Sequence, residues 1–310
     1  QFVPRYCAMQ YRICHLTCYR YSQPVSLKPH LLRLQPRSDG SQHLQQFQMS
    51  IAPEPATRSA LIDLEGNAAI ALWFGSEKTS ELSIETASLV ETTRVNPFDY
   101  LMEPWAVNFP LDYPTSLLSG LQPYLHNPMF PAIAPGVVEL AQDLLFEVQG
   151  NVGYFLMALT QKIYETCEYT VRDVGPPHPA GVTWSQKRGS CRDLAVLFMA
   201  ACRSLGLAAR FVSGYQEGDP HLNENELHAW VEIYLPGGGW RGFDPTLGLA
   251  VADRHIVLAA GAHPSQAAPV TGALHEGASV TSTLEAQVRL EVLDCAAASP
   301  AAPAAKAAPM

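Results

Sequence analysis

The sequence predicts an α+β protein, in which an N-terminal all-β domain precedes a core whose helices come first and whose antiparallel strands come after them. Two observations predict this order. Up to about residue 95, apolar residues alternate in short runs that are separated by Pro, Gly and Ser-Asp-Gly. From residue 137 onward, helical periodicity comes first and strand-like runs follow it. A Rossmann-type parallel sheet would need the two kinds of element to alternate.

Residues 1–95 are expected to fold as a β-sandwich or a small barrel. The strand-like runs are "RICHLTCYRYSQPV", "HLLRLQPR", "QQFQMSIAP", "SALIDLEGNAAIALWF" and "ELSIETASLVETT". Residues 96–136 are rich in Pro and aromatic residues. We expect them to form a connecting segment that packs on the surface.

Residues 137–294 are predicted to form the core. Helical periodicity covers residues 137–148 and 152–166, and a further helix is expected directly after "KRGS". Three strand-like runs follow, "AARFVSGYQE", "LHAWVEIYL" and "WRGFDPT", and "STLEAQVRLEVL" is expected to add an edge strand. Residues 295–310 are rich in Ala and Pro and are predicted to be a disordered tail.

The charge balance limits the classes of partner. The chain has a net charge of -9 and no block of basic residues, which argues against a nucleic acid or an acidic membrane surface as partner. No apolar run reaches the ~18 to 20 residues that span a bilayer. The start lacks a charged segment followed by an apolar one, so no signal peptide is expected, and the chain begins with Gln1 instead of an initiator Met. We expect a cytoplasmic protein, of an oligomeric state that the sequence leaves open.

The cysteines also favour a cytoplasmic protein. Seven cysteines, an odd number scattered along a long chain, predict reduced thiols instead of a disulfide framework. The run "CHLTC" from Cys14 to Cys18 looks like half a zinc site, but it lacks a second ligand pair at zinc spacing. No Gly-rich phosphate loop is present either, because "PGGGW" lies between two strand-like runs. We therefore expect neither a metal nor another cofactor.

Cys191 has a special place in the predicted helix. Ser190 is a good N-cap and Asp193 follows three positions later, as in a capping box, so Cys191 is expected to be the first helical residue. At that position, unpaired backbone N–H groups and the positive end of the helix dipole favour a thiolate. Lys187 and Arg188 add positive charge nearby.

Cys202 lies on the same stripe of this helix, eleven residues further along. The two sulfurs are roughly 16 Å apart at 1.5 Å of rise per residue, so they cannot form a disulfide within the helix. Cys202 falls among Phe198 and Leu205, where a buried, small apolar residue is the expected role. Core packing is also the alternative role for Cys191. A base close to Cys191 would favour the role of nucleophile over that of core packing.

The run "LHAWVEIYL" supplies a candidate base, His228, and Asp244 ends the next strand. If Tyr234 pairs with Trp240, the residue numbers of paired positions sum to 474 and His228 shares a face with Asp244 as its diagonal neighbour. An odd sum would turn Asp244 to the opposite face. The Gly-rich loop permits the even register, for example with Gly238 in the left-handed conformation.

The three residues together predict nucleophilic catalysis. A lone histidine is more often structural than catalytic. With Cys191, His228 and Asp244 in that order, however, the thiolate attacks, the imidazole transfers the proton, and the carboxylate holds the imidazole in the correct tautomer.

The same residues carry a family resemblance. The stretches "GSCRDLAVLFMAACRSLGLAARFVSGY" and "LHAWVEIYLPGGGWRGFDPT" resemble the bacterial branch of the transglutaminase-like cysteine peptidases, and "TCYRYSQPVSLKPHLLRLQPR" resembles the β-rich domain that precedes the core in that branch. The resemblance covers about residues 11–260. It implies a papain-like core, with Cys191 as nucleophile, His228 as base and Asp244 as orienting carboxylate, acting on amide bonds through a thioester acyl-enzyme.

Two details of the site stay open. The family commonly continues into a Gly-Arg-aromatic stretch, whereas "AAGAHPSQAAP" follows "RHIVL" here, so that edge of the site differs. The backbone N–H of Cys191 is expected to be the first oxyanion donor. The second donor is open among Tyr169, Trp184 and Gln186.

The leading hypothesis is a cysteine peptidase or amidase that cleaves a peptide, isopeptide or side-chain amide bond in a peptide or protein substrate. One alternative is a transglutaminase, in which an amine instead of water resolves the thioester. The other is a peptide-binding module on the same fold without catalysis. The sequence does not name the substrate.

Overall fold

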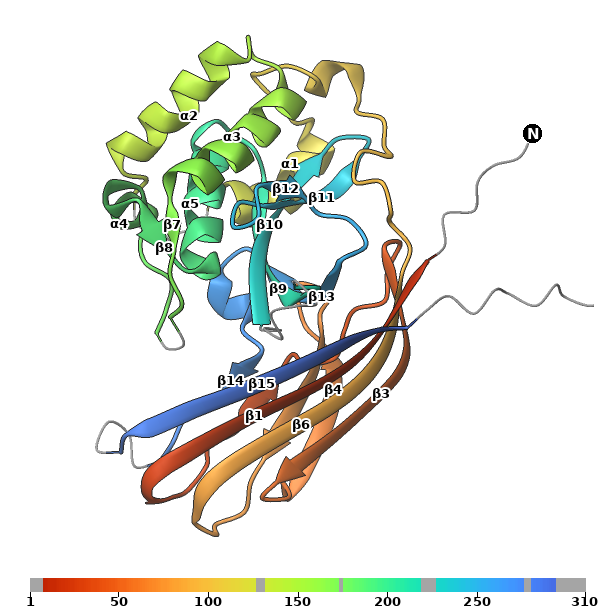
Figure 1. The fold of residues 1–310 in the computed structure, drawn as a ribbon, viewed down its shortest axis with the longest axis vertical. Coiled ribbons are helices and arrows are strands. Elements are labelled where there is room, and N and C mark those ends of the chain that lie inside the picture. The colour runs from red at the N-terminus through yellow and green to blue at the C-terminus, as the bar shows by residue number, and fades with distance from the viewer. Residues whose placement is uncertain (1–7, 127–131, 173–174, 219–226, 276–279, 294–310) are drawn as a thin grey trace, which may run out of the picture.

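The computed structural model describes residues 8–126, 132–172, 175–218, 227–275 and 280–293 and has two domains (Figure 1). The predicted tail, residues 295–310, lies outside the described residues. A β-sandwich occupies the lower half of Figure 1, and the labelled helices all belong to the domain above it. The predicted α+β class is confirmed.

Two four-stranded antiparallel sheets form the β-sandwich. The first has the order β15 (Ser282–Leu293), β1 (Met9–Val25), β6 (Thr79–Thr92) and β3 (Gln42–Ala52). The second has the order β14 (Val270–Thr271), β2 (His30–Leu32), β5 (Ala68–Trp73) and β4 (Thr57–Ile62). Buried residues of both sheets belong to one hydrophobic cluster, so the sheets share a core.

Strand β1 shows why these runs form strands. Tyr11 and Ile13 are buried in the shared core, while Arg12 and Cys14, which alternate with them, are exposed on the other face. Cys14 and Cys18 share that other face, four residues apart, which places them about 13 Å from each other along the strand. One tetrahedral zinc ion cannot bridge this distance.

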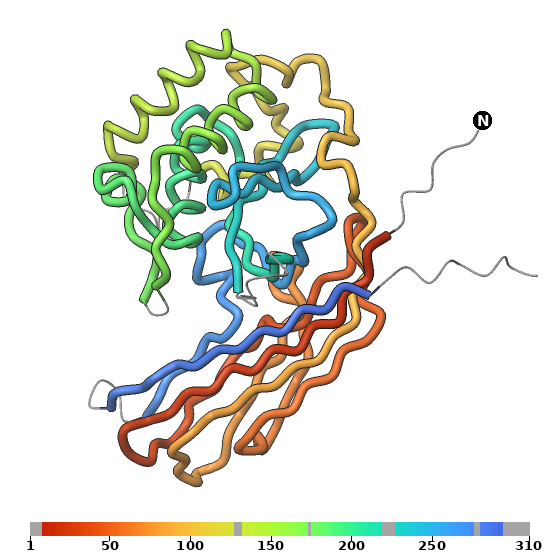
Figure 2. Tube along the Cα trace, in the orientation of Figure 1, coloured from red at the N-terminus to blue at the C-terminus, as the bar shows by residue number. Residues whose placement is uncertain are grey.

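The last described strand belongs to the N-terminal domain. The sequence placed residues up to 294 in the core, but β15 pairs with β1 along its length, from Tyr21–Ser282 to Gln10–Leu293. Figure 2 shows the red β1 and the blue β15 side by side. The chain therefore returns from the second domain to complete the first sheet, and the expected edge strand is found at the edge of the other domain's sheet.

The second domain has its helices first, as expected. They are α1 (Thr115–Leu125), α2 (Pro135–Glu147), α3 (Val152–Thr166), α4 (Ala180–Gln186) and α5 (Cys191–Ser204), with one 3₁₀ turn (Pro104–Ala106) before them and another (Pro264–Ala267) late in the chain. A small parallel pair consists of β7 (Glu168–Tyr169) and β8 (Arg188–Gly189). None of the described helices is long and apolar enough to cross a lipid bilayer.

A five-stranded antiparallel sheet completes this domain. Its order is β12 (Leu249–Ala250), β11 (Gly239–Asp244), β10 (Leu227–Leu235), β9 (Ala209–Gln216) and β13 (His255–Gly261). Helix α5 packs on one face of the sheet and is buried on almost every side, because α2 and α3 cover it from outside. Trp230 packs on the opposite face of the sheet. Gly214 of β9 allows the backbone of β13 to lie close to β9, since a Cβ atom at residue 214 would lie 2.1 Å from the carbonyl oxygen of Ile256.

Two helices lie where the sequence predicted none. Helix α1 falls within the expected connecting segment and contains Gly120 and Pro123, which obscure its periodicity. Its Leu121 packs with Tyr113 and Ala208 in a separate buried cluster, so tertiary contacts stabilise it. Helix α4, of seven residues, is too short to give a periodic pattern.

The two domains are joined through the free edge of β13. The side-chain amide of Gln42 donates to the carbonyl of Val257 (3.0 Å) and accepts from its N–H (2.7 Å). Asn67 makes the same pair of bonds to Ala260, at 2.8 and 2.9 Å. Both amides are buried, and they satisfy edge groups that a further strand would otherwise pair. These bonds hold the β-sandwich in place beside the second domain.

Candidate active site

Cys191 begins α5, as the capping pattern predicts. Ser190 is the N-cap, and the carboxylate of Asp193 accepts hydrogen bonds from the Ser190 N–H (2.8 Å) and hydroxyl (2.8 Å). The Cys191 residue is 8% exposed and its side chain lines a cleft. The thiol thus lies at the positive end of a long buried helix and still faces an open space.

Asp193 also accepts hydrogen bonds from two residues that precede this helix in the chain, Arg172 and His178. Its carboxylate accepts from the backbone N–H of His178 (2.6 Å) and from Nη2 of Arg172 (2.6 Å). Arg192 in turn donates to the carbonyl oxygen of Arg172. Burial raises the pKa of Asp193, but the bonds from His178 and Ser190 and the charge of Arg172 outweigh it, so the pKa lies below its usual range. An ionised Asp193 fixes both the cap and the cleft rim.

The hairpin has the even register. Tyr234 pairs with Trp240, as the sum of 474 requires, and this prediction is confirmed. The example of a left-handed Gly238 is wrong, because the positive φ angles fall at Gly237 (84°) and Gly239 (70°). A side chain at Gly237 would also lie 2.5 Å from the carbonyl oxygen of Leu101, so this turn needs glycine for space as well.

The register brings His228 and Asp244 together. Nε2 of His228 lies 2.7 Å from Oδ2 of Asp244, and the carboxylate is fully buried. Oδ1 accepts from the N–H of Thr246 (2.9 Å) and of Leu247 (3.3 Å), in the turn that follows the strand. The carboxylate is therefore held from both sides, and its pKa lies well below the usual range, since the charge of His228 and the hydrogen bonds from His228 and His255 outweigh the effect of burial.

The second of these histidines is a residue that the sequence did not single out. Nε2 of His255, the first residue of β13, lies 3.0 Å from the same Oδ2 of Asp244. Burial lowers the pKa of His255, so its ring is neutral, and because a carboxylate only accepts, Nε2 carries the proton. The ring also meets Trp230 edge to face, with centroids 5.1 Å apart. His255 thus donates a hydrogen bond that orients Asp244.

Side-chain ligand atoms of His228, Asp244 and His255 all lie within 4.8 Å of one another, a grouping that a metal ion could use. In this arrangement, however, both Nε2 atoms face Oδ2 as hydrogen-bond donors. A metal needs the lone pairs of those nitrogens, so binding would require both rings to lose these protons. The geometry suits proton handling better than metal coordination.

Cys191 contacts the imidazole of His228. The thiol lies close enough to influence the imidazole, and because Nε2 faces Asp244, Nδ1 is the nitrogen left for the thiol. Burial is the largest influence on this imidazole and lowers its pKa. The charge of Asp244, its hydrogen bond and the contact with Cys191 together outweigh burial and raise the pKa of His228 to about 10. The imidazole therefore carries a proton at neutral pH.

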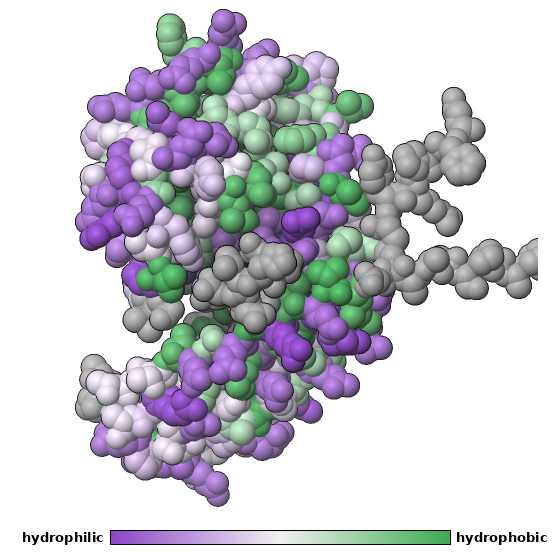
Figure 3. Space-filling model, viewed as in Figure 1, coloured by the Kyte–Doolittle hydropathy of each residue, from purple (hydrophilic) through white to green (hydrophobic). Residues whose placement is uncertain are grey.

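Cys191 and His228 line a cleft of about 670 Å³ between the two domains. The first sheet of the β-sandwich supplies one wall, through Tyr19 on β1 and Leu284 and Val288 on β15. The space-filling view in Figure 3 shows the outline of the molecule indented where the two domains meet. The N-terminal domain is thus part of the site and not only an attachment to it.

The expected oxyanion donors are not all at the cleft. Tyr169 lines it and is 45% exposed. Trp184 and Gln186 are not among the described residues that line it. The indole of Trp184 packs against the helical core with the ammonium of Lys187 above it, and Gln186 is exposed. Of the three side chains, the structure brings only Tyr169 to the cleft.

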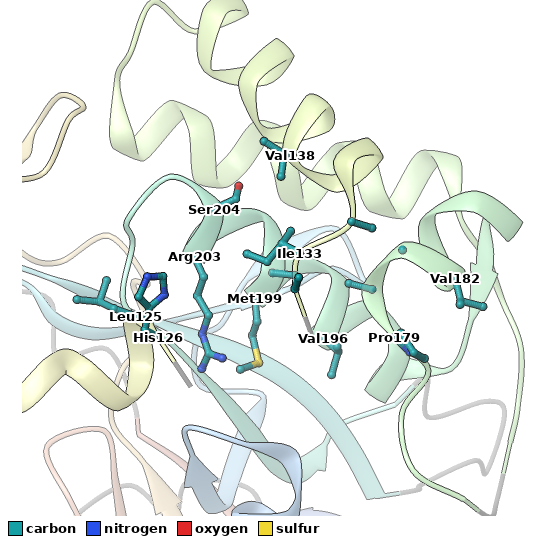
Figure 4. A pocket seen from close by; sticks show the side chains of 15 residues that line it. Leu125, His126, Ile133, Val138, Pro179, Val182, Val196, Met199, Arg203 and Ser204 are labelled. Atoms are coloured by element: carbon teal, nitrogen blue, oxygen red, sulfur yellow. The ribbon is translucent and has the colours of Figure 1, made fainter. Parts of the chain in front are cut away.

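A larger cavity, of about 940 Å³, lies on another side of α5 (Figure 4). Met199 and Arg203 of α5 border it together with Ile133 and Val138, and its lining is mostly apolar. It contains neither Cys191 nor His228. Cys202 lies inside the core, fully buried and with its pKa raised well above the usual value by burial, which confirms its predicted role in packing.

Comparison with known proteins supports the same architecture. A crystal structure of a proposed cysteine protease from Cytophaga hutchinsonii has a TM-score of 0.69 to this chain and 24% identity, and the match covers 93% of this chain and 91% of that one. At this level of identity the likeness establishes the fold. A protein-glutamine gamma-glutamyltransferase of Pseudomonas aeruginosa is 28% identical over 148 residues, which are 44% of this chain and only 21% of that protein.

Longer matches cover both domains. An uncharacterized protein of Mycobacterium tuberculosis (strain ATCC 25618 / H37Rv) is 31% identical over 283 residues, 86% of this chain and 88% of that protein. Residues 11–91 match the bacterial transglutaminase-like N-terminal region, and residues 139–245 match the transglutaminase-like superfamily. The chain therefore belongs to the transglutaminase-like superfamily, as a bacterial type in which the transglutaminase-like N-terminal region precedes the core.

Proposed function

We propose that this protein is a cysteine-dependent amidohydrolase that cleaves a peptide, isopeptide or side-chain amide bond. The observation that carries the proposal is the position of His228, which interacts with Cys191 and lies 2.7 Å from the buried Asp244, in a cleft that Cys191 and His228 both line. This is the geometry of a nucleophile, a base and an orienting carboxylate.

The chemistry follows from these positions. The Cys191 thiolate attacks the amide carbonyl carbon and forms a C–S bond, and the oxyanion is stabilised by the N–H groups at the start of α5. The His228 imidazolium gives its proton to the leaving nitrogen as the C–N bond breaks. Water then gives a proton to His228 and attacks the thioester carbon. The C–S bond breaks, which releases the carboxylic acid and regenerates the Cys191 thiolate beside the His228 imidazolium.

Hydrolysis and transamidation differ only in the second nucleophile. The similarity to part of a glutamyltransferase favours a transglutaminase as the second candidate. We expect the enzyme to release ammonia or an amine from a glutamine-containing peptide and to leave a free carboxylate. Adding a primary amine and measuring product masses tests this. An amide to the added amine as the main product would replace the hydrolase proposal by the transglutaminase.

His255 is expected to act as a positioning residue. Replacing it by phenylalanine keeps the ring but removes the donor to Asp244, so we expect kcat/KM to fall about tenfold to a hundredfold, because a hydrogen bond to a charged group contributes about 1.5–3 kcal/mol. His255→Gln places an amide donor there and should restore part of the loss. Steady-state kinetics over a range of pH measures both.

A purely structural role for His255 gives a different result. Both variants would then lower the free energy of unfolding while kcat/KM and its pH dependence stayed at the level of the unchanged enzyme. Denaturant unfolding of the two variants alongside the kinetics separates the two outcomes.

A further inference from the structure

Strand β15 is an edge strand, and it borders the cleft that holds Cys191. In its sheet it pairs with β1 on one side, and no other strand within the described ranges pairs with its second edge. Figure 1 shows β15 as the strand of that sheet nearest to the helical domain. Leu284, Ala286 and Val288 of β15 line the cleft together with Cys191. A free strand edge thus lies beside the candidate nucleophile.

The register shows which backbone groups point to this free edge. The N–H of Ser22 in β1 donates to the carbonyl of Thr281 (3.0 Å), and the residue numbers of this pair sum to 303, as they do along the whole ladder. Residues opposite each other alternate between pairs that exchange hydrogen bonds and pairs that do not. Odd-numbered residues of β15 therefore bond to β1. Even-numbered ones direct their N–H and C=O groups away from it.

Three of the four β15 residues that line the cleft are even-numbered, and Glu285 is the odd-numbered exception. Leu284, Ala286 and Val288 stand opposite Tyr19, Thr17 and His15 on the inner face of the sheet. Each offers one backbone donor and one acceptor to the free edge, and these groups need partners once they are covered. The side chains of Leu284 and Val288 are half-buried and apolar. The wall therefore offers a ladder of backbone groups with an apolar surface next to it.

We propose that β15 binds an extended segment of the substrate polypeptide as an additional strand, which places an amide of that segment at Cys191. The inference rests on the proposed function and names its substrate class. Strand addition derives affinity from main-chain hydrogen bonds and selectivity from alternate side chains. The preferred substrate is thus an unfolded or extended chain with apolar residues at alternate positions. A small isolated amide lacks the groups that pair with β15.

Proline substitution tests this pairing. Ala286→Pro removes an N–H that points to the free edge, so the ladder with β1 keeps its bonds and the strand is expected to fold. Val292→Pro is the matched control, because Val292 is even-numbered on the same strand but does not line the cleft. Both are combined with Cys191→Ala, and binding of a fluorescein-labelled nonapeptide with valine at alternate positions is measured by anisotropy.

We expect Ala286→Pro to weaken peptide binding about tenfold, because the hydrogen bond from the Ala286 N–H to the peptide is lost and the adjacent hydrogen bonds are disturbed. We expect Val292→Pro to leave peptide binding unchanged. Two N-methylated nonapeptides give a second measurement on protein with an unaltered β15. One carries methyl groups on the odd-numbered nitrogens and the other on the even-numbered ones. Only one set of nitrogens faces β15, so one peptide should lose binding and the other keep it.

Three results would overturn the proposal. The unmethylated nonapeptide and the two methylated ones could bind equally well, both methylated peptides could lose the same affinity, or the two proline variants could bind the nonapeptide with equal affinity. Because binding is measured with Cys191→Ala, the result does not depend on turnover. If the protein binds the nonapeptide at β15 but the unchanged protein hydrolyses no amide, the proposed hydrolase activity is refuted and the proposal of strand addition stands.

Discussion

Replacing Cys191 by alanine is expected to lower kcat/KM for a peptide amide roughly 10⁶-fold, as loss of the nucleophile does in other triad hydrolases. The thiol is the only group at the start of α5 that forms a bond to the substrate in the proposed mechanism. Alanine is well tolerated near the start of a helix, so the fold should persist. Single-turnover assays detect the residual rate, and mass spectrometry after iodoacetamide treatment shows whether the modified site is lost.

Cys202→Ala is the matched control for this variant. Cys202 is in the same helix, fully buried and about three turns from Cys191, so its replacement leaves a small cavity in the core. We expect a lower Tm and an unchanged kcat/KM. Substantial turnover by Cys191→Ala, or loss of activity in Cys202→Ala with an intact fold, would contradict the assignment of the nucleophile.

The parts of the site that the sequence predicted depend on local rules. The capping pattern around Ser190 and Asp193 places Cys191 at the first position of α5, because orphan N–H groups at a helix start need such partners. The pairing of Tyr234 with Trp240 depends on a short loop and on alternation in the two strands. Both signals lie within a few residues of the groups that they position.

The parts that the sequence missed depend on distant contacts. Alternation identifies "STLEAQVRLEVL" as a strand, but nothing in it names a partner more than 260 residues away in β1. His255 is similar. β10 and β9 lie between its strand and that of Asp244 in the sheet, yet Nε2 of His255 lies 3.0 Å from Oδ2 of Asp244. A histidine before an apolar run gives no local sign of this contact.

The position of β15 changes how the N-terminal domain is understood. The first sheet is completed by a strand that follows the core in sequence, so the chain crosses between the domains twice. The amides of Gln42 and Asn67 fix one side of the junction, and β15 supplies a wall of the cleft on another. Cleft shape and domain attachment are therefore properties of the same interface.

Replacing Asp244 by asparagine is expected to lower kcat/KM about 10⁴-fold, the effect of the same change in a serine protease triad. The side chain keeps its size but loses the charge that holds the imidazolium of His228. With that charge lost, burial dominates and the pKa of His228 falls from about 10. In the unchanged enzyme, activity should decline as the pH rises through about 10. In the variant, the decline should begin at a lower pH.

The same ion pair also contributes to stability, with a defined pH window. The pKa of Asp244 is lowered from 3.8, so its contribution is present above that pH, and the pKa of His228 is raised from 6.5, so its contribution is present below that pH. The difference in free energy of unfolding between the unchanged protein and Asp244→Asn should be greatest between these two values. It should shrink as the pH rises through about 10. Denaturant unfolding at pH 5.5 and pH 10.5 measures this change.

Glu232→Gln separates catalysis from the loss of a buried carboxylate. Glu232 lies on β10 in the same sheet and accepts a hydrogen bond from Arg210 (2.7 Å), and both side chains are buried. Its replacement should destabilise the fold, because Arg210 is left without its anionic partner, yet kcat/KM should keep its pH profile. If Glu232→Gln shifts the alkaline limb as far as Asp244→Asn does, that limb reports general destabilisation of the sheet and not the proton on His228.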